Sequence, residues 1–342
     1  MTVAFDLPPA SEADVPPEER GLLRDEVRLM SVRPGGLDHS RFRDLPELLE
    51  PGDLVVVNTS ATLPARVDAR RADGRVVPLH VSTQLDDGAW VVELRRPGND
   101  GPDLGVEPGT VLDLPGGVRL HLTEAFPDPG RPSRLWRARP EPQVPTVVYL
   151  PAHGRPIGYG YLRHGVALDD LQNVYATEPG SAEMASAGRP FSERLVTRLA
   201  ARGVPVVPLV LHTGVSSPEL HEPPYPERFA VPEVTARLVT STKDAGRRVV
   251  AVGTTVTRAL ESATDDDGVT RPDRGWTDLV LGPDRPARIV TGLVTGLHAP
   301  EASHLLLLEA VAGRRMVAQA YAAAVEQRYL WHEFGDAMLF LP

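Results

Sequence analysis

The sequence has 342 residues, 42% of them hydrophobic, and a formal net charge of −10 at pH 7; this length predicts about two globular domains. It contains no cysteine, which excludes disulfides, thiolate nucleophiles and cysteine-ligated metal sites. No apolar run approaches the ~18 residues of a membrane-spanning helix and no signal segment is visible, so we expect a soluble, cytoplasmic protein without a membrane partner.

The region between Arg66 and Pro145 consists of short apolar runs separated by glycine and proline clusters. Four of these runs have the alternation and composition of strands, at residues 76–81, 90–94, 111–114 and 118–122. Such a series is typical of a small antiparallel barrel. We therefore expect residues 66–145 to form an inserted β domain, within a larger domain made of residues 1–65 and 146–342.

Helical and strand patterns alternate in the part of the chain that begins near Glu193. Helices are predicted at residues 195–202, 232–244 and 303–312, and a strand at 206–211. This alternation favours an α/β layer around a largely parallel sheet.

A strand, a turn and a helix follow one another at residues 249–262. Four apolar residues form the expected strand, Gly253 permits a tight turn, and Thr254 or Thr255 can cap the helix. Open α/β sheets bind ligands at the carboxyl ends of their strands. The segment therefore indicates a small-molecule site, although a corner without a ligand gives the same pattern.

The ten histidines are scattered along the sequence. No two of them lie four residues apart beside an acidic residue in a helical pattern, so we expect no metal site. The sequence does not determine the oligomeric state.

Short blocks of residues, distributed along almost the whole chain, form an ordered pattern. They are residues 24–29 (RDEVRL), 42–46 (FRDLP), 51–54 (PGDL) with Asn58, 64–66 (PAR), Gln172, 174–176 (VYA), 180–181 (GS), 211–212 (LH) with Gly214, 249–262, 275–279 (GWTDL), His298 with Pro300, and 335–339 (GDAML). In order and spacing these blocks resemble the S-adenosylmethionine:tRNA ribosyltransferase-isomerases, a family that acts in queuosine biosynthesis.

This resemblance implies a large barrel-like α/β domain that is interrupted by a small β domain. It also implies the family's reaction. The ribosyl part of S-adenosylmethionine is transferred to a 7-aminomethyl-7-deazaguanine base in tRNA and isomerised, with release of adenine and methionine and formation of epoxyqueuosine. S-adenosylmethionine is then a substrate, and we expect no further cofactor.

Three residues are candidates for the catalytic groups of this chemistry. The sulfonium acidifies the neighbouring ribose C5′ protons, and histidine is the usual base at neutral pH. His212 ends a predicted strand and His298 lies in a proline-bounded loop. The carboxylate of Asp278 can hold a ribose diol or oppose the sulfonium. The alternative for each histidine is a structural hydrogen bond, and for the aspartate a helix cap or turn.

Further residues are candidates for substrate binding. Arg258 can bind the methionine carboxylate through two parallel hydrogen bonds, but Glu261 shares its helix face and the two could simply pair. Tyr175 and Trp276 could cover adenine or the sulfonium with their rings, with core packing as the alternative. The full expected set is Gly253, Thr254, Thr255, Arg258, Glu261, Tyr175, Trp276 and Asp336.

The sequence departs from the family pattern at positions where the family has polar groups. Pro190 replaces a histidine, Ala61 a basic residue and Gly296 an asparagine. The charge of −10, with Lys243 as the single lysine, also differs from the basic surface that tRNA binding normally requires. Three hypotheses therefore stay open: the family reaction on tRNA, ribosyl transfer or cleavage of S-adenosylmethionine with a small-molecule acceptor, and a non-catalytic paralogue.

Overall fold

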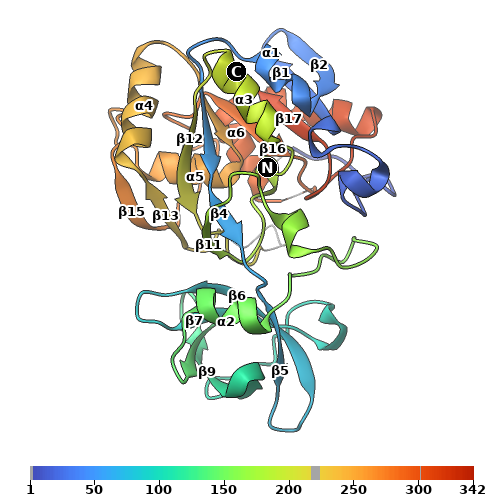
Figure 1. Cartoon of the computed structure of the whole chain (residues 1–342), viewed down its shortest axis with the longest axis vertical. Helices are drawn as coiled ribbons and strands as arrows, with labels where there is room; N and C mark the ends of the chain where they lie inside the picture. The colour runs from blue at the N-terminus through green and yellow to red at the C-terminus, as the bar shows by residue number, and fades with distance from the viewer. Residues whose placement is uncertain (1–2, 217–223, 301) are drawn as a thin grey trace.

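A nine-stranded mixed sheet forms the larger part of the computed structural model, which describes residues 3–216, 224–300 and 302–342 (Figure 1). Its strands are, in spatial order, β15 (Asp273–Thr277), β13 (Glu227–Val231), β12 (Val206–Leu211), β3 (Leu54–Asn58), β14 (Val249–Val252), β16 (Gly292–Gly296), β17 (Ala337–Phe340), β1 (Arg28–Arg33) and β2 (Gly36–Arg41). The four central strands β12, β3, β14 and β16 are parallel, as are β1 and β17.

The other pairs of this sheet are antiparallel. The α/β class is thus confirmed, whereas the expectation of a largely parallel sheet holds only for its centre. The reason is visible at β1 and β2, which are joined by Pro34 and Gly35 alone. A connection of two residues can join only antiparallel neighbours, because a parallel pair needs a long crossover.

Helices cover both faces of the sheet (Figure 1). They are α1 (Leu45–Leu48), α3 (Glu193–Ala201), α4 (Glu233–Asp244), α5 (Thr254–Ser262) and α6 (His304–Glu326). The remaining helix, α2 (Thr146–His153), packs against the barrel, where Tyr149 and Leu150 join the core (Figure 1). Short 3-10 helices are η1 (Pro17–Arg20), η2 (Arg24–Glu26), η3 (Phe42–Asp44), η4 (Pro97–Asn99), η5 (Pro115–Gly117), η6 (Leu168–Leu171) and η7 (Ser186–Gly188). Leu54 and Val56 of β3 pack in the core under α4, α5 and α6, whereas Val55 and Val57 pack in the core under α1 and α3.

Local residues determine where α3 begins and where α6 is interrupted. α3 begins at Glu193 because the Ser192 hydroxyl accepts a hydrogen bond from the Leu195 amide at 3.1 Å. The helix expected at 303–312 continues to Glu326, and Gly313 interrupts it with a φ of 76°. The prediction therefore missed the helical segment after this glycine. None of the helices in the described residues is long and apolar enough to cross a membrane.

A closed antiparallel barrel forms the second part of the molecule (Figure 1). Its strands are β5 (Arg66–Arg70), β6 (Val76–Gln84), β7 (Trp90–Leu94), β8 (Val111–Leu114), β9 (Val118–Ala125) and β10 (Leu135–Glu141), in the spatial order β10-β7-β6-β5-β8-β9. Leu79, Trp90, Leu112 and Leu120 are fully buried in its core. The expected small antiparallel barrel is confirmed, and we propose residues 66–145 as the inserted domain.

The chain enters the barrel directly from the central sheet. After β3 it forms β4 (Ser60–Thr62), which pairs with β11 (Glu178–Ser181), and then reaches β5 at Arg66. In Figure 1 this two-stranded sheet lies between the two parts. The end of β3 therefore faces the barrel.

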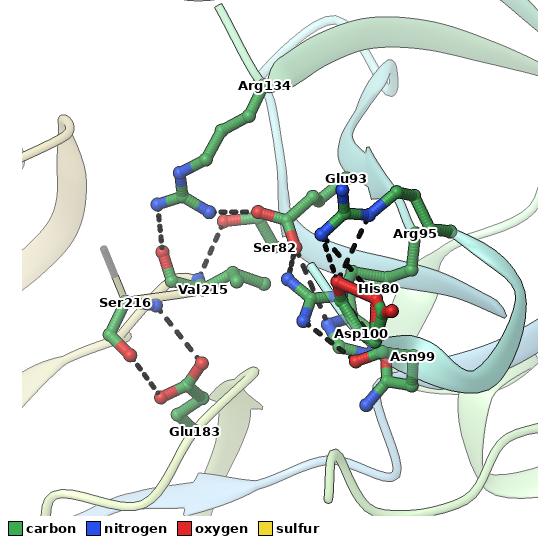
Figure 2. A network of polar contacts seen from close by, with 11 residues as sticks. His80, Ser82, Glu93, Arg95, Asn99, Asp100, Arg134, Glu183, Val215 and Ser216 are labelled. Carbon is green, nitrogen blue, oxygen red and sulfur yellow. Dashed lines mark hydrogen bonds and ion pairs between the residues drawn. The ribbon is translucent and has the colours of Figure 1, made fainter. Parts of the chain in front are cut away.

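A polar network fixes the segment that follows β12 against the barrel (Figure 2). Glu93 of β7 is fully buried and pairs with Arg134, which donates to the Val215 carbonyl at 3.2 Å. The Val215 amide donates to the Ser82 hydroxyl of β6 at 3.0 Å. The Ser216 hydroxyl donates to Glu183 at 2.7 Å. Buried charge pairs of this kind hold a geometry because removal of one partner leaves the other charge uncompensated.

A second contact joins the edge strand β15 to the barrel. The Trp276 indole donates to the Asp86 carboxylate at 2.9 Å, and Arg228 of β13 pairs with the same carboxylate. The Arg228 guanidinium also lies over the Trp276 ring, 5.1 Å from its centroid. Two separate contacts thus hold the barrel against the sheet.

His80 in the barrel predicts a pH-dependent stability. Its side chain is buried and neither ring nitrogen has a hydrogen-bond partner within the described residues. Burial, with Arg95 and Arg66 nearby, lowers its pKa from 6.5 to about 3. A lowered pKa contributes stability above the unfolded-state value and loses it as the pH falls. Between pH 7 and pH 5 we expect this histidine to remove about 2 kcal/mol of unfolding free energy.

Urea unfolding of the wild type and of His80→Gln at the two pH values measures this difference. The wild type is expected to lose about 2 kcal/mol more than the variant on acidification. His121→Gln removes a partly exposed histidine of the same barrel and serves as the matched control. Equal pH dependence of the wild type and His80→Gln would contradict the prediction.

Candidate active site

Four neighbouring strand ends form one edge of the sheet on the side of the barrel (Figure 1). His212 follows β12, Asn58 ends β3, Gly253 follows β14 and His298 lies two residues after β16. Because adjacent strands are about 4.8 Å apart, the ends of β12 and β16 are separated by about 14 Å along this edge. Ligands of open α/β sheets bind at such an edge, so we describe it as the candidate site.

His212 is held by hydroxyl groups. Its Nδ1 lies 2.7 Å from the Ser60 hydroxyl, which lies 2.6 Å from the Ser181 hydroxyl. Asn58 fixes the preceding backbone, since its side chain accepts from the Leu211 amide and donates to the Leu211 carbonyl. Burial lowers the pKa of His212, opposed in part by Glu178. The imidazole is therefore neutral at pH 7, and its Nε2 has no hydrogen-bond partner in the described part of the chain.

The turn after β14 differs from the expectation in its cap. Gly253 itself is the N-cap of α5, with a φ of 92°, and no side chain caps the helix. The prediction that Thr254 or Thr255 caps this helix is therefore wrong. Both threonines lie in the first turn of α5, and the buried Thr255 hydroxyl has no partner among the described residues. An unpaired buried hydroxyl of this kind is available to a ligand or to water.

A glycine allows a second loop to approach this turn. A Cβ on Gly188 would collide with the Tyr175 hydroxyl and the Asn173 amide nitrogen, and a Cβ on Gly253 would lie 3.2 Å from Ala187. The Tyr175 hydroxyl and the Asn173 Oδ1 are also buried without a partner in the described residues. Burial raises the pKa of Tyr175, so its hydroxyl stays protonated. The two loops thus bring three unsatisfied polar atoms to the end of β14.

His298 belongs to a group of three histidines, together with His304 and His332. Its ring stacks on His304, with centroids 4.6 Å apart and planes 6° apart. Its Nε2 lies 3.1 Å from the Thr295 hydroxyl, which donates to the Gly296 carbonyl. A hydroxyl that donates to Gly296 can only accept from His298, so we assign the proton to Nε2 and the acceptor role to Nδ1.

The charges of this group are set by burial. Burial lowers the pKa of His298 well below 6.5, with further lowering from His304 and His332. Burial and the charge of Arg258 lower the pKa of His304 to about 4.

Within the described residues no three histidine, aspartate or glutamate side chains are arranged to hold a metal.

Arg258 and Glu261 do not pair with each other. Arg258 is buried, pairs with Glu227 and donates to the carbonyls of Thr277 and Leu279 at 3.1 Å. Both oxygens of Glu261 accept from backbone amides of residues 288–290 at 2.9–3.0 Å. Each side chain thus already has a structural role in the described contacts, and direct substrate contact by either one stays a prediction.

Asp336 is likewise bound within the protein. Its carboxylate accepts from the Arg28 backbone amide at 2.8 Å, from the Arg28 side chain at 3.0 Å and from the Leu330 amide at 2.8 Å. It therefore joins β1 to the segment after α6. Its role in substrate binding stays a prediction, and these contacts give it a structural one.

The structure does not bring Asp278 and Trp276 together with the histidines through any described contact. Asp278 is exposed and has no hydrogen bond or ion pair within the described residues. Trp276 contacts Asp86 and Arg228 at the barrel interface. Catalysis by Asp278 and ring stacking on a ligand by Trp276 stay predictions.

The three departures from the family pattern lie in or beside the candidate edge. Ala61 lies in β4, and Gly296 ends β16, where an added Cβ would meet open space. Pro190 is buried and follows Arg189, which binds Glu18 through two hydrogen bonds of 2.7 and 2.9 Å. The sequence also did not single out Ser60, His332 or the carboxyls of Glu183 and Glu333. They come from distant segments that have no shared spacing, so no local pattern could have identified them.

Comparisons with known proteins agree with this architecture. The model of the family described as "Queuosine biosynthesis protein" matches residues 2–340. A Thermus thermophilus protein named S-adenosylmethionine:tRNA ribosyltransferase-isomerase is 35% identical, and one of the same name from Heliobacterium modesticaldum is 34% identical; each match covers 98% of both chains. The crystal structure of S-adenosylmethionine tRNA ribosyltransferase from Thermotoga maritima matches 99% of both chains with a TM-score of 0.54 and 29% identity. The chain therefore belongs to the queuosine biosynthesis protein family.

Proposed function

We propose that this protein transfers the ribosyl group of S-adenosylmethionine to a 7-aminomethyl-7-deazaguanine base in tRNA and isomerises it, with release of adenine and methionine. The full-length match to relatives named for this reaction carries the proposal. S-adenosylmethionine is the substrate, and we propose no further cofactor. Because tRNA modification takes place where tRNA and S-adenosylmethionine are present, we propose a cytoplasmic location.

His212 is the best candidate for the base that removes the C5′ proton. Its pKa is lowered by burial, but that of His298 is lowered further, well below 6.5. A base works best when its pKa lies near the working pH, and this favours His212. Ser60 orients the ring by binding Nδ1 at 2.7 Å, so Nε2 is the atom that would receive the proton. His298, neutral with a free Nδ1, is suited to accept a hydrogen bond from the substrate.

The unsatisfied polar atoms at the end of β14 suit the ribose. The Thr255 hydroxyl, the Tyr175 hydroxyl and the Asn173 Oδ1 are buried and have no partner among the described residues. Buried polar groups are nearly always hydrogen-bonded in the working state of a protein. Ribose hydroxyls both donate and accept, so they can satisfy all three atoms.

A second candidate is the same cleavage of S-adenosylmethionine with a small-molecule acceptor. The formal net charge of −10 favours it, because binding of tRNA phosphates requires several basic side chains on one surface. Binding of a small-molecule acceptor does not require such a basic surface. The two candidates differ only in the acceptor, so one experiment separates them.

That experiment incubates the purified protein with S-adenosylmethionine and follows adenine and methionine by mass spectrometry. The acceptors are tRNA that carries 7-aminomethyl-7-deazaguanine, the same tRNA with unmodified guanine, and no tRNA. Release that requires the modified tRNA supports the proposed function. Equal release in all three reactions would contradict it and favour a small-molecule acceptor or water.

A further inference from the structure

A carboxyl with one buried, unpartnered oxygen lies next to a histidine in the chain, at Glu333 beside His332. Glu333 is in the turn between α6 and β17, and its Oε2 is buried without a hydrogen-bond partner. Among the described residues no arginine, lysine or histidine forms an ion pair with it. Burial raises its pKa to about 7. Buried polar atoms are normally hydrogen-bonded, so this oxygen is available to accept a hydrogen bond from a ligand.

A stack of aromatic rings lies near this carboxyl and includes the neighbouring residue His332. The Tyr161 ring lies between Tyr159, 5.7 Å away, and His332, 4.6 Å away, and is nearly parallel to both. The Tyr161 hydroxyl is also buried without a partner in the described residues. Burial raises the pKa of Tyr159, and the charges of Glu183 and Glu333 raise it further, so both carboxyls lie near this ring. Carboxyls and aromatic ring faces together are suited to bind a cation.

This cluster is continuous with the candidate active site. The His332 amide donates to the Leu297 carbonyl, next to His298, at 3.4 Å, and His332 is close enough to lower the pKa of His298. On the other side, Glu183 accepts from the hydroxyl and amide of Ser216, in the segment that follows His212 (Figure 2). The cluster therefore extends from the neighbourhood of His298 to the segment that follows His212.

We propose that Glu333 binds the ammonium group of the acceptor and removes one of its protons, with Tyr161 and His332 forming the wall of this amine site. The inference rests on the proposed function, in which the acceptor base carries an aminomethyl group. In the step, one N–H bond breaks, the proton forms an O–H bond on the Glu333 carboxylate, and the electron pair stays on nitrogen. The neutral amine is then the nucleophile.

The sulfonium of S-adenosylmethionine is a poorer match for this site, and its methionine ammonium is distinguished by the binding experiment below. A sulfonium has no proton to give, and it is best opposed by a carboxylate that is ionised at every working pH. Glu333 instead titrates near neutral pH because it is buried. A carboxyl of this kind is suited to exchange a proton with its ligand.

Other charged groups near Glu333 already have partners. Glu12 pairs with His332 at 3.3 Å, and burial lowers the pKa of His332, so this histidine is a weak cation. Arg20 donates to the Phe334 carbonyl at 2.6 Å. Glu183 is hydrogen-bonded to Ser216. Among these groups, Glu333 is therefore the one with a buried acceptor oxygen left for a ligand.

Binding of free bases tests the site without turnover. Isothermal titration calorimetry compares 7-aminomethyl-7-deazaguanine with 7-methyl-7-deazaguanine, which lacks the amine. The wild type is expected to prefer the amine by about 10-fold or more, and Glu333→Gln to lose that preference. Tyr161→Phe, which removes only the hydroxyl, is expected to reduce it. Affinity for S-adenosylmethionine is measured in parallel and should be the same in all variants.

Glu12→Gln is the matched control, since it also removes a carboxylate next to His332 but one that is partly exposed and paired. It should keep the amine preference. A Glu333→Gln variant with the wild-type preference, a wild type without any preference, or a Glu333→Gln variant that binds S-adenosylmethionine more weakly would each overturn the inference. The proposed function is tested separately by tRNA-dependent adenine release in the wild type, so the two can fail independently.

Discussion

Replacement of His212 by glutamine is expected to lower kcat for adenine release by about 100-fold or more, with an unchanged KM for S-adenosylmethionine. The variant cannot take up the C5′ proton, whereas the hydroxyls that orient the ring are still in place. His212 is fixed through Nδ1 by Ser60, and its Nε2 is the available base. Steady-state kinetics with saturating acceptor give both constants.

Two further variants make this result interpretable. Ser60→Ala removes the hydrogen bond that orients the ring and is expected to reduce kcat less than His212→Gln does. His164→Gln changes an exposed histidine outside the candidate active site. It is expected to leave kcat unchanged. A His212→Gln variant with wild-type kcat would rule out the proposed base and would favour His298 in that role.

Replacement of Glu93 by glutamine is expected to destabilise the protein by about 3–5 kcal/mol. Glu93 is fully buried in the barrel and pairs with Arg134 and Arg95 (Figure 2). Without its carboxylate, the Arg134 and Arg95 guanidinium groups both lose a charge that compensates them. Urea unfolding at neutral pH measures the change in unfolding free energy.

Glu124→Gln provides the comparison for this prediction. Glu124 lies on the same barrel and pairs with Arg137 at 3.6 Å, but its side chain is 41% exposed. Exposed pairs contribute about 0–1 kcal/mol, so its loss should be small. If Glu93→Gln and Glu124→Gln have similar unfolding free energies, the buried network makes no measurable contribution to the stability of the protein.

The sequence predicted those features that depend on local periodicity. The four barrel strands it indicated correspond to β6, β7, β8 and β9, and the segment 249–262 is β14 followed by α5. Alternation and glycine-rich turns are properties of a few neighbouring residues, so they can be recognised without the fold. The strands β5 and β10 were not singled out, although they close the barrel.

Partners from distant segments could not be predicted. Arg258 and Glu261 share a helix face, which suggested that they pair, but each binds another segment: Glu227 for the arginine and residues 288–290 for the glutamate. Asp336 binds Arg28, more than 300 residues away in the chain. Similarly, nothing in the sequence near Glu333 indicates that one of its carboxyl oxygens, Oε2, is buried without a partner. Such facts depend on which strands become neighbours, and the order of strands is not a local property.

The contact between Trp276 and Asp86 also makes the protein its own optical probe. Of the four tryptophans, Trp90, Trp136 and Trp331 are buried in the interior, and only Trp276 lies half-buried where the edge strand meets the barrel. Separation of the barrel from the sheet would expose this indole to water and remove its carboxylate partner. The fluorescence of the other three would stay as it is. The emission spectrum of the unlabelled protein therefore reports whether the two parts move apart when a ligand is added.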